Sequence, residues 1–454
     1  MKRTVVLVAV VGLLTSAPSG CDANQKTPLP EDAPRQEINI EDQKKAVAEI
    51  EKLGGTTERD AGGWNGPVTR VTFYGTDVAD AALEHLRGLA QLRELELGGT
   101  KVTDAGLKHL AGLTQLRNLT LSRTEITDAG LLHLANLTHL RHLNVGDTKV
   151  TDAGLEHLKS LAQLQELVLD RTQVTDAGLE RLKVLKQLRH LDVRGAKVTD
   201  AGLAHLNALT HLQRFTLSPT WLTDAGLEHL RSLTQLRHLD VGGRKITDAG
   251  LQHLKGLTQL QDLTLSPTSA TDDGLEHLKG LTQLRRLEIS APTLTGTGLQ
   301  HLKGMTQLQE LGIPLAHLTD AGLQQLNSLT QLERLRIPLT GLTDAGLANL
   351  KNLTKLRQLD LQWTRVTDAG LEHLKAFPQL QFLGLCRTKV TDAGLQHLKG
   401  LTQLEELDLR DTQVTDAGLE HLKGLPRLKW VQLEGTRTTD AGTKGLLKEV
   451  DIPR

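Results

Sequence analysis

Apolar and polar positions follow one short pattern along most of the chain. In residues 92–115, LRELELGGTKVTDAGLKHLAGLTQ, an alternating segment around Leu95 and Leu97 is followed by leucines spaced three apart from Leu107 to Leu113. Alternation with a period of two predicts a strand with one buried face, and the spacing of three predicts a helical segment. We therefore expect each unit to consist of one strand followed by one helical segment.

The pattern recurs every 24 residues without an insertion, from Val68 to Leu428. The 360 residues between these positions make fifteen steps, so the chain contains 16 repeats. A single unit cannot bury its leucines, whereas stacked units share a continuous core. Strands stack ~4.8 Å apart and helices need roughly 10 Å. The array must therefore curve, with a parallel sheet on the concave side and helices on the convex side.

The unit L-x-x-L-x-L-x-x-T-x-V-T-D-A-G-L resembles the leucine-rich repeat family, and the resemblance covers residues 68–451. Its T-D-A-G-L variant is similar to long arrays in exported bacterial proteins and to the repeats of F-box substrate adaptors. No F-box-like helical segment precedes the array, and the export signal described below argues against an adaptor role. The resemblance implies an α/β solenoid of horseshoe shape that binds protein.

Three polar or small positions accompany the leucines of each unit. Thr103 and Asp104 precede the helical segment, and we expect their side-chain oxygens to cap free N–H groups at its start. Asp occupies this position in 15 of 16 repeats, with Gly296 as the exception. We expect Gly106 and its equivalents to allow close approach of the neighbouring repeat.

A further threonine follows each strand in twelve of the 16 repeats, beginning with Thr76 and Thr100. Many leucine-rich repeat proteins have Asn at this position. We expect the hydroxyls to form a ladder of hydrogen bonds to backbone in the turns. The four repeats without the threonine carry Ala196, Arg244, Pro292 and Ala316.

The N-terminus reads as an export signal over residues 1–20, with basic Lys2 and Arg3 before an apolar run too short to span a bilayer. Ser19, Gly20 and Cys21 resemble a bacterial lipobox, although Pro18 departs from it. The resemblance implies lipidation of Cys21. The alternative is ordinary cleavage nearby, which leaves Cys21 as a free thiol. Residues 21–40 are polar and proline-rich, and we expect a disordered tether.

Both ends of the array carry candidate caps. Residues 41–67 begin with an amphipathic helical pattern from Glu41 to Leu53, which we expect to cover the first repeat. The array itself spans residues 68–454. Its last repeat has Thr443 and Glu449 where the core expects Leu, so we expect a C-terminal cap that faces water.

Composition narrows the possible partners. Lys and Arg number 53 and Asp and Glu number 54, a balance that argues against nucleic-acid binding. No apolar run reaches 18 residues, so we expect membrane contact through the N-terminal anchor only. The sequence predicts no cofactor and a monomer.

The histidines and cysteines do not form a recognisable catalytic or metal site. Twelve of the 18 histidines share one helical position, and equivalents on successive repeats lie too far apart to hold one ion. His190 with Asp192, and His238 with Asp240, share a strand face and form a weak metal-site hypothesis. Cys386 is the only cysteine besides Cys21, and we interpret it as a small half-exposed residue without a base. We therefore expect no enzyme activity.

One group of repeats departs from the small or charged residues found after most strands. Repeats 11 to 13 carry apolar residues there, repeat 14 adds an aromatic residue on the same concave face, and two further side chains border them. The candidate partner-binding residues are Pro314, Leu315, Arg336, Pro338, Leu339, Trp363, Phe382 and Cys386. Apolar surface patches often mark partner sites. The alternatives are drift in a copied repeat and local repacking around the irregular segment 290–292.

These observations predict a non-catalytic, protein-binding scaffold exposed at a bacterial cell envelope and lipid-anchored there, or else secreted or periplasmic and soluble. One alternative is a carbohydrate or polymer binder that uses Trp221, Trp363 and Trp430 as stacking platforms. Another is a purely structural envelope spacer.

Overall fold

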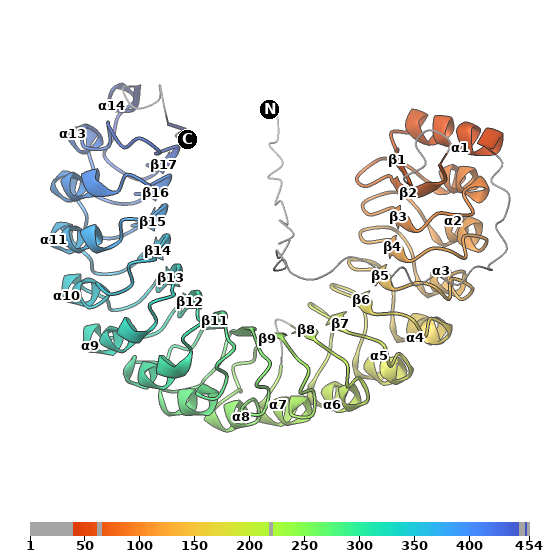
Figure 1. Cartoon of the computed structure of the whole chain (residues 1–454), viewed down its shortest axis with the longest axis horizontal. Helices are drawn as coiled ribbons and strands as arrows, with labels where there is room; N and C mark the ends of the chain where they lie inside the picture. The colour runs from red at the N-terminus through yellow and green to blue at the C-terminus, as the bar shows by residue number, and fades with distance from the viewer. Residues whose placement is uncertain (1–39, 61–65, 218–220, 445–449, 452–454) are drawn as a thin grey trace, which may run out of the picture. The chain divides into compact units, whose positions relative to one another are not determined.

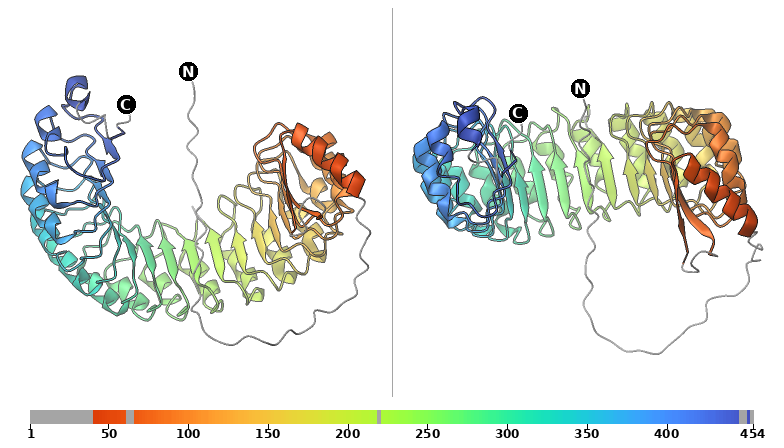
Figure 2. Two further views of the ribbon diagram at one scale, coloured as in Figure 1. Left: turned by 45° about the horizontal axis from the view of Figure 1, so that its top comes forward. Right: turned by 90° about the horizontal axis from the view of Figure 1, so that it is seen from above.

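The computed structural model describes residues 40–60, 66–217, 221–444 and 450–451. The predicted export signal, Cys21 and nearly all of the tether lie outside these residues. From residue 40 onward the repeats stack into one curved solenoid, with strands on the inner face and helices on the outer face (Figures 1 and 2). Within the described ranges, no helix has the length and apolar character needed to cross a membrane.

The concave face is a sheet of 17 strands, as expected from the alternating segments. Successive strands from β2 to β17 pair in parallel and in register, so that Leu95 lies beside Leu119 and Leu119 beside Leu143. The parallel strands are β2 (Val68–Thr72), β3 (Glu94–Glu96), β4 (Asn118–Thr120), β5 (His142–Asn144), β6 (Glu166–Val168), β7 (His190–Asp192), β8 (Arg214–Leu217), β9 (His238–Val241), β10 (Asp262–Leu265), β11 (Arg286–Ile289), β12 (Glu310–Gly312), β13 (Arg334–Arg336), β14 (Gln358–Asp360), β15 (Phe382–Gly384), β16 (Glu406–Asp408) and β17 (Trp430–Gln432).

The convex face carries short helical segments, most of them one α-helical turn, in many repeats continued by a 3₁₀ turn. The α-helices are α2 (Asp104–Leu107), α3 (Asp128–Leu132), α4 (Asp152–Leu155), α5 (Asp176–Arg181), α6 (Asp200–Leu203), α7 (Asp224–Leu230), α8 (Asp248–Gln252), α9 (Asp320–Leu323), α10 (Asp344–Ala348), α11 (Asp368–Leu371), α12 (Asp392–Leu395), α13 (Asp416–Leu419) and α14 (Asp440–Lys444). The 3₁₀ segments are η2 (Asp80–Gly88), η3 (Lys108–Leu110), η4 (Glu156–Ser160), η5 (Leu182–Val184), η6 (Ala204–Ala208), η7 (Asp273–Leu278), η8 (Thr297–Gly304), η9 (Gln324–Ser328), η10 (Glu372–Ala376) and η11 (Gln396–Gly400). In repeats 1, 9 and 10 the 3₁₀ segment is the whole helical part.

The core between the two faces is built from columns of leucine. Leu95, Leu107, Leu110 and Leu113 are all almost completely buried, as are the equivalent leucines among the described residues. Phe73, Phe215 and Phe377 are the largest side chains in this core. Because leucine fills each column in nearly every repeat, the core continues from repeat to repeat.

The Asp, Thr and Gly that recur along the array link neighbouring repeats. Of the predicted capping pair, only the threonine caps its own helical segment. Thr127 caps its own helix by accepting from the Ala129 N–H at 3.3 Å. Asp104 instead reaches the next repeat: its Oδ1 accepts from the Thr127 N–H at 2.8 Å, and its Oδ2 accepts from the Thr127 hydroxyl at 2.6 Å. A Cβ on Gly130 would lie 2.4 Å from Asp104 Oδ1, so the glycine provides room for the carboxylate.

The predicted ladder of threonine hydroxyls is confirmed in ten turns. Thr100, for example, donates to the Leu97 carbonyl at 2.7 Å and is itself buried. The other nine are Thr76, Thr124, Thr148, Thr172, Thr340, Thr364, Thr388, Thr412 and Thr436. Thr268 differs, because its hydroxyl donates to the Ile246 carbonyl of the previous repeat at 3.1 Å.

The tenth repeat lacks the carboxylate link because Gly296 stands in the aspartate position. Gly296 has a left-handed backbone with φ of 100°. Without the carboxylate, the Thr319 N–H donates to the Thr295 carbonyl at 2.9 Å. A direct backbone bond therefore replaces the bridging side chain at this junction.

Different structures cover the two ends of the array. α1 (Ile40–Lys52) lies against the first repeat, where Gln43 Oε1 accepts from the Val68 N–H at 2.7 Å. An unexpected strand, β1 (Thr56–Arg59), pairs antiparallel with β2. At the other end, Asp451 pairs with the edge of β17, and its carbonyl accepts from the Val431 N–H at 3.0 Å. Thr443 is half-buried, and Glu449 lies outside the described residues.

Candidate interaction surface

Three of the predicted partner-binding residues occupy the same turn position in successive repeats. Leu315, Leu339 and Trp363 follow strands β12, β13 and β14 at the edge of the concave sheet, and are 45%, 44% and 47% exposed. The Leu339 N–H donates to the Gln362 carbonyl and the Trp363 N–H donates to the Cys386 carbonyl, both at 2.9 Å. These bonds hold adjacent turns together. We call Leu315, Leu339 and Trp363 the rim patch.

The rim patch lies on left-handed backbone. Leu315, Leu339 and Trp363 have φ of 66°, 58° and 59°. The equivalent turns of the first two repeats contain Gly75 and Gly99, with φ of 70° and 72°. Glycine adopts this conformation without strain, whereas an L-residue with a bulky side chain loses about 1–2 kcal/mol. The rim patch therefore keeps large apolar side chains where the backbone favours glycine.

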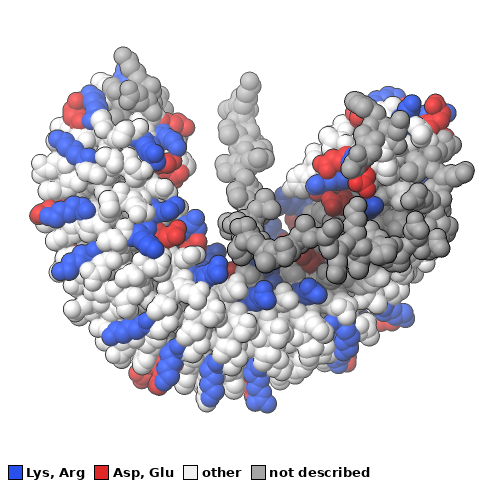
Figure 3. Space-filling model, viewed as in Figure 1, with Lys and Arg blue, Asp and Glu red and all other residues white. Residues whose placement is uncertain are grey.

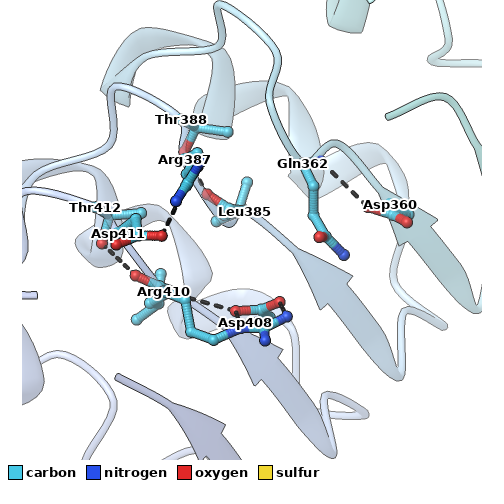
Figure 4. A network of polar contacts seen from close by, with 10 residues as sticks. Asp360, Gln362, Leu385, Arg387, Thr388, Asp408, Arg410, Asp411 and Thr412 are labelled. Atoms are coloured by element: carbon cyan, nitrogen blue, oxygen red, sulfur yellow. Dashed lines mark hydrogen bonds and ion pairs between the residues drawn. The ribbon is translucent and has the colours of Figure 1, made fainter. Parts of the chain in front are cut away.

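Neighbouring charges hold the tryptophan ring in place. The Arg387 guanidinium lies over the Trp363 ring, 4.0 Å from its centroid. Arg387 Nε also donates to Asp411 Oδ2 at 2.7 Å, as Figure 4 shows. One face of the indole is thus covered by a cation that is itself fixed by a carboxylate. The side chain remains about half exposed despite this contact.

The remaining predicted residues surround the rim patch in different environments. Pro314 and Pro338 are half-buried beside it, and Arg336 is exposed and lies 3.5 Å from a carboxylate oxygen of Glu288. Phe382 is separate, because it projects from strand β15 and not from a turn. The structure therefore brings the two prolines and the rim patch to one rim, and places Arg336 and Phe382 on the neighbouring sheet surface.

The expectation that Cys386 is half exposed is wrong. The residue is 7% exposed, because its position is covered between adjacent turns of the stack. Burial raises the pKa of its thiol, with a further contribution from the Asp408 charge. A protonated, covered thiol is a poor nucleophile and a poor contact for a partner.

The concave sheet carries ion pairs between neighbouring strands. Arg286 and Arg334 flank Glu310, and His142 Nδ1 lies 2.9 Å from Glu166 Oε2. The bond from His142, followed by that from His190, holds the pKa of Glu166 well below its usual range. The sheet therefore presents charges that are mostly satisfied by other strands.

The same-strand histidine and aspartate pairs do not form a site. His238 pairs with Asp262 of the next strand, and Asp192 instead binds Arg194, with Oδ2 2.7 Å from Nη2. Burial raises the pKa of Asp240, an effect that the Arg194 charge partly offsets. Across the described ranges, no three histidine, cysteine or acidic side chains are placed to hold a metal ion.

A cavity of about 640 Å³ opens on the edge of repeats 6 to 9, and sequence reasoning missed it. Lys197, Trp221 and Lys245 occupy one position in three successive repeats there, and Arg244 and Pro267 complete much of its wall. Trp221 is 83% exposed. The 24-residue spacing of these three residues was a signal that could have revealed the site.

Comparison with protein families identifies the repeat. A family model described as "Leucine-rich repeat region" matches residues 127–342, and a second, "Leucine Rich repeat", matches residues 91–111, 352–375 and 400–423. The chain is a leucine-rich repeat protein. A search of curated proteins found no match to this leucine-rich repeat protein.

Solved structures share the fold at low sequence identity. A leucine-rich repeat protein of Leptospira interrogans is 17% identical, with a TM-score of 0.56 over 84% of this chain and 96% of that one. The functional domain of InlJ from Listeria monocytogenes is 19% identical, with a TM-score of 0.51 over 81% of this chain and 73% of that one. Leucine-rich repeat proteins, the family to which this chain belongs, are typically non-catalytic.

Proposed function

We propose that this leucine-rich repeat protein is a protein-binding scaffold and that the rim patch is its principal contact surface. The observation that carries the proposal is the presence of exposed Leu and Trp side chains on left-handed backbone in three successive repeats. Large apolar side chains that gather at exposed positions often mark a contact surface.

The two other interpretations of the rim patch fit the structure less well. Drift in a copied turn would mix residue types from repeat to repeat, as in the other left-handed turns, which carry Arg123, Asp147, Arg171, Arg387 and Asp411. Repeats 11 to 13 instead carry an exposed, large apolar side chain three times in succession. Repacking around the irregular tenth repeat would bury the side chains, but Leu315 and Leu339 are each almost half exposed. Binding a partner explains why these apolar side chains remain exposed.

The energetic gain available to a partner is moderate. Burying each of the three apolar side chains contributes at most about 1.5–3 kcal/mol to the free energy of binding, and less here because each side chain is already partly covered. The entropy lost when the two molecules associate reduces the net gain further. The rim patch therefore suits a contact centre surrounded by polar interactions, such as those of Arg336 and Arg387.

The test is crosslinking and affinity capture from the native cell envelope. We expect Trp363→Ala and Leu339→Ala to lose capture of a defined partner while changing the free energy of unfolding by less than about 1 kcal/mol. Arg171→Ala is the matched control, because Arg171 occupies the same left-handed turn far from the rim patch. Unchanged capture by both patch variants would place the partner elsewhere.

We also propose that the scaffold is exported and lipid-anchored through Cys21. The basic start, the short apolar run and Ser19-Gly20-Cys21 support this proposal. Mass spectrometry of the mature protein should find acyl chains on an N-terminal Cys21. An unmodified N-terminus elsewhere would contradict the anchor and leave a secreted or periplasmic protein.

A second candidate function is binding of an anionic polymer at the cavity beside Trp221. The exposed indole offers a flat surface, and Lys197, Lys245 and Arg244 offer three cations around the cavity. Titration with an acidic polysaccharide should then give binding that Trp221→Ala removes, with a neutral polysaccharide as control. If neither polymer binds and no partner is captured, a purely structural spacer is favoured.

A further inference from the structure

Three strands near the C-terminal end of the array place two aromatic side chains on either side of a carboxylate. Phe382 of β15 lies in register with Glu406 of β16, and Glu406 lies in register with Trp430 of β17. Each is more exposed than the buried Leu or Val that follows it, so all three side chains project from the concave face of the sheet. Strands β15 to β17 lie at the end of the solenoid opposite α1 (Figure 1). None of the polar interactions described above involves Glu406.

A small cavity lies between these side chains. Its volume is about 120 Å³, and Asp408, Arg410 and Gln432 complete its polar lining. This is room for the end of one side chain. Trp430 is 39% exposed and Phe382 is half-buried, which leaves both rings accessible from the concave side.

The spacing of the rings suits a cation. Neighbouring strands lie ~4.8 Å apart, so a group held above the middle strand is roughly 5 Å from both flanking positions. A cation attracts an aromatic face within about 6 Å of the ring centroid. The middle strand contributes Glu406, whose carboxylate supplies the opposite charge.

The other polar groups of the cavity also favour a donor with positive charge. Arg410 is already bound to Asp408, with Nε 3.0 Å from Oδ1 and Nη2 2.8 Å from Oδ2 (Figure 4). Within the residues that the structure describes, Glu406 has no ion pair, and the shielded Oε1 of Gln432 accepts no hydrogen bond. The lining thus keeps one uncompensated negative charge and one free acceptor.

We propose that Phe382, Glu406 and Trp430 form a clamp for a basic side chain, arginine or lysine, of the protein partner. This inference rests on the proposed protein-binding function and adds the chemistry of a second contact. The clamp is continuous with the rim patch, because the Trp363 turn is hydrogen-bonded to the Cys386 turn that follows β15. A partner that covers Trp363 therefore reaches the clamp by extending over the next repeats.

The test uses the full chain and simple probes, so that it needs no partner. Tryptophan indole N–H signals are followed by NMR, and Trp430→Phe assigns the signal of Trp430. We expect ethylguanidinium and n-butylammonium to shift this signal saturably at millimolar concentration, with the stronger binding of the two showing whether arginine or lysine is preferred. n-Pentanol, a neutral probe of similar length, should bind at least roughly fivefold more weakly, because it lacks the charge that Glu406 recognises.

Variants assign the binding to the clamp. We expect Glu406→Gln to weaken cation binding roughly five- to tenfold, because it removes the charge and keeps the shape. Glu310→Gln is the matched control, since Glu310 occupies the same position on β12 but lies between two arginines, and it should change nothing. Circular dichroism of each variant checks that the array is intact.

Two results would overturn the clamp. One is equal binding of n-pentanol and the cations, which would make the cavity merely apolar. The other is cation binding that is absent, or that Glu406→Gln leaves unchanged in a folded protein. Either result leaves the capture experiment on Leu339 and Trp363 standing, so failure of the clamp and failure of the proposed function are distinguishable.

Discussion

The turns after β3 and β13 have the same backbone conformation and carry opposite kinds of residue. Gly99 has φ of 72° and Leu339 has φ of 58°. Glycine adopts this left-handed conformation without strain, whereas leucine disfavours it. The stack of repeats can impose it because neighbouring turns are hydrogen-bonded to each other. The stack therefore accepts residues other than glycine at this turn, and in repeats 11 to 13 that residue is apolar and exposed.

The largest expected effect concerns the regular repeats. Deleting residues 140–163 removes one whole unit, and the leucine columns on either side still match, so we expect a folded, shorter array. Deleting only residues 140–151 places one helical segment directly after another, and we expect nearby repeats to unfold. Circular dichroism and protease resistance measure both outcomes. Similar behaviour of the two deletions would contradict the 24-residue unit.

The next largest effect concerns the link between regular repeats. Asp104→Ala removes two hydrogen bonds to Thr127, and we expect the free energy of unfolding to fall by about 2 kcal/mol. Urea denaturation measures the change, and Lys108→Ala on the exposed side of the same helical segment is the control. No loss of stability would mean that the carboxylate link contributes little and that the repeats are joined by the leucine core and by backbone hydrogen bonds, as they are at Gly296.

A reciprocal exchange tests the comparison of the two turns directly. We expect Leu339→Asn to raise the free energy of unfolding by up to about 1 kcal/mol, because asparagine tolerates a positive φ. Gly99→Leu should lower it by about 1 kcal/mol, and the space around Gly99 is open enough that backbone strain is the main cause. If Leu339→Asn is destabilising, Leu339 belongs to the packing of its turn and the rim patch is misinterpreted.

The smallest effect concerns two aspartates in opposite environments. Burial raises the pKa of Asp240, so its charge is unfavourable at neutral pH, and Asp240→Asn should raise stability by less than about 1 kcal/mol. The backbone N–H of Thr439, followed by its hydroxyl, lowers the pKa of Asp416, so Asp416→Asn should reduce stability at neutral pH. Asp240 ceases to be unfavourable as the pH falls to the ordinary carboxyl range, and Asp416 loses its contribution as the pH falls through its lowered pKa. Melting temperatures at neutral and acidic pH should therefore converge toward the parent protein for both variants.

The sequence by itself determined the repeat, its period and its curvature. These follow from residue spacing, because alternating and three-residue leucine patterns fit one strand and one helical segment, and identical units stack only in register. The threonine ladder followed for the same reason, since each hydroxyl, as in Thr100, bonds to a carbonyl three residues earlier. Candidate residues on the rim were also found from their departure from the repeat.

Only the tertiary structure decided which groups meet between repeats. Asp104 has its partner 23 residues away, and no local pattern distinguishes that bond from a cap on its own helix. The burial of Cys386, the left-handed backbone of Leu339 and the cavity between Phe382 and Trp430 likewise depend on neighbouring turns and strands. The physical reason is that a 24-residue period fixes which residues share a column, whereas the packing of one repeat on the next fixes the orientation and exposure of each side chain.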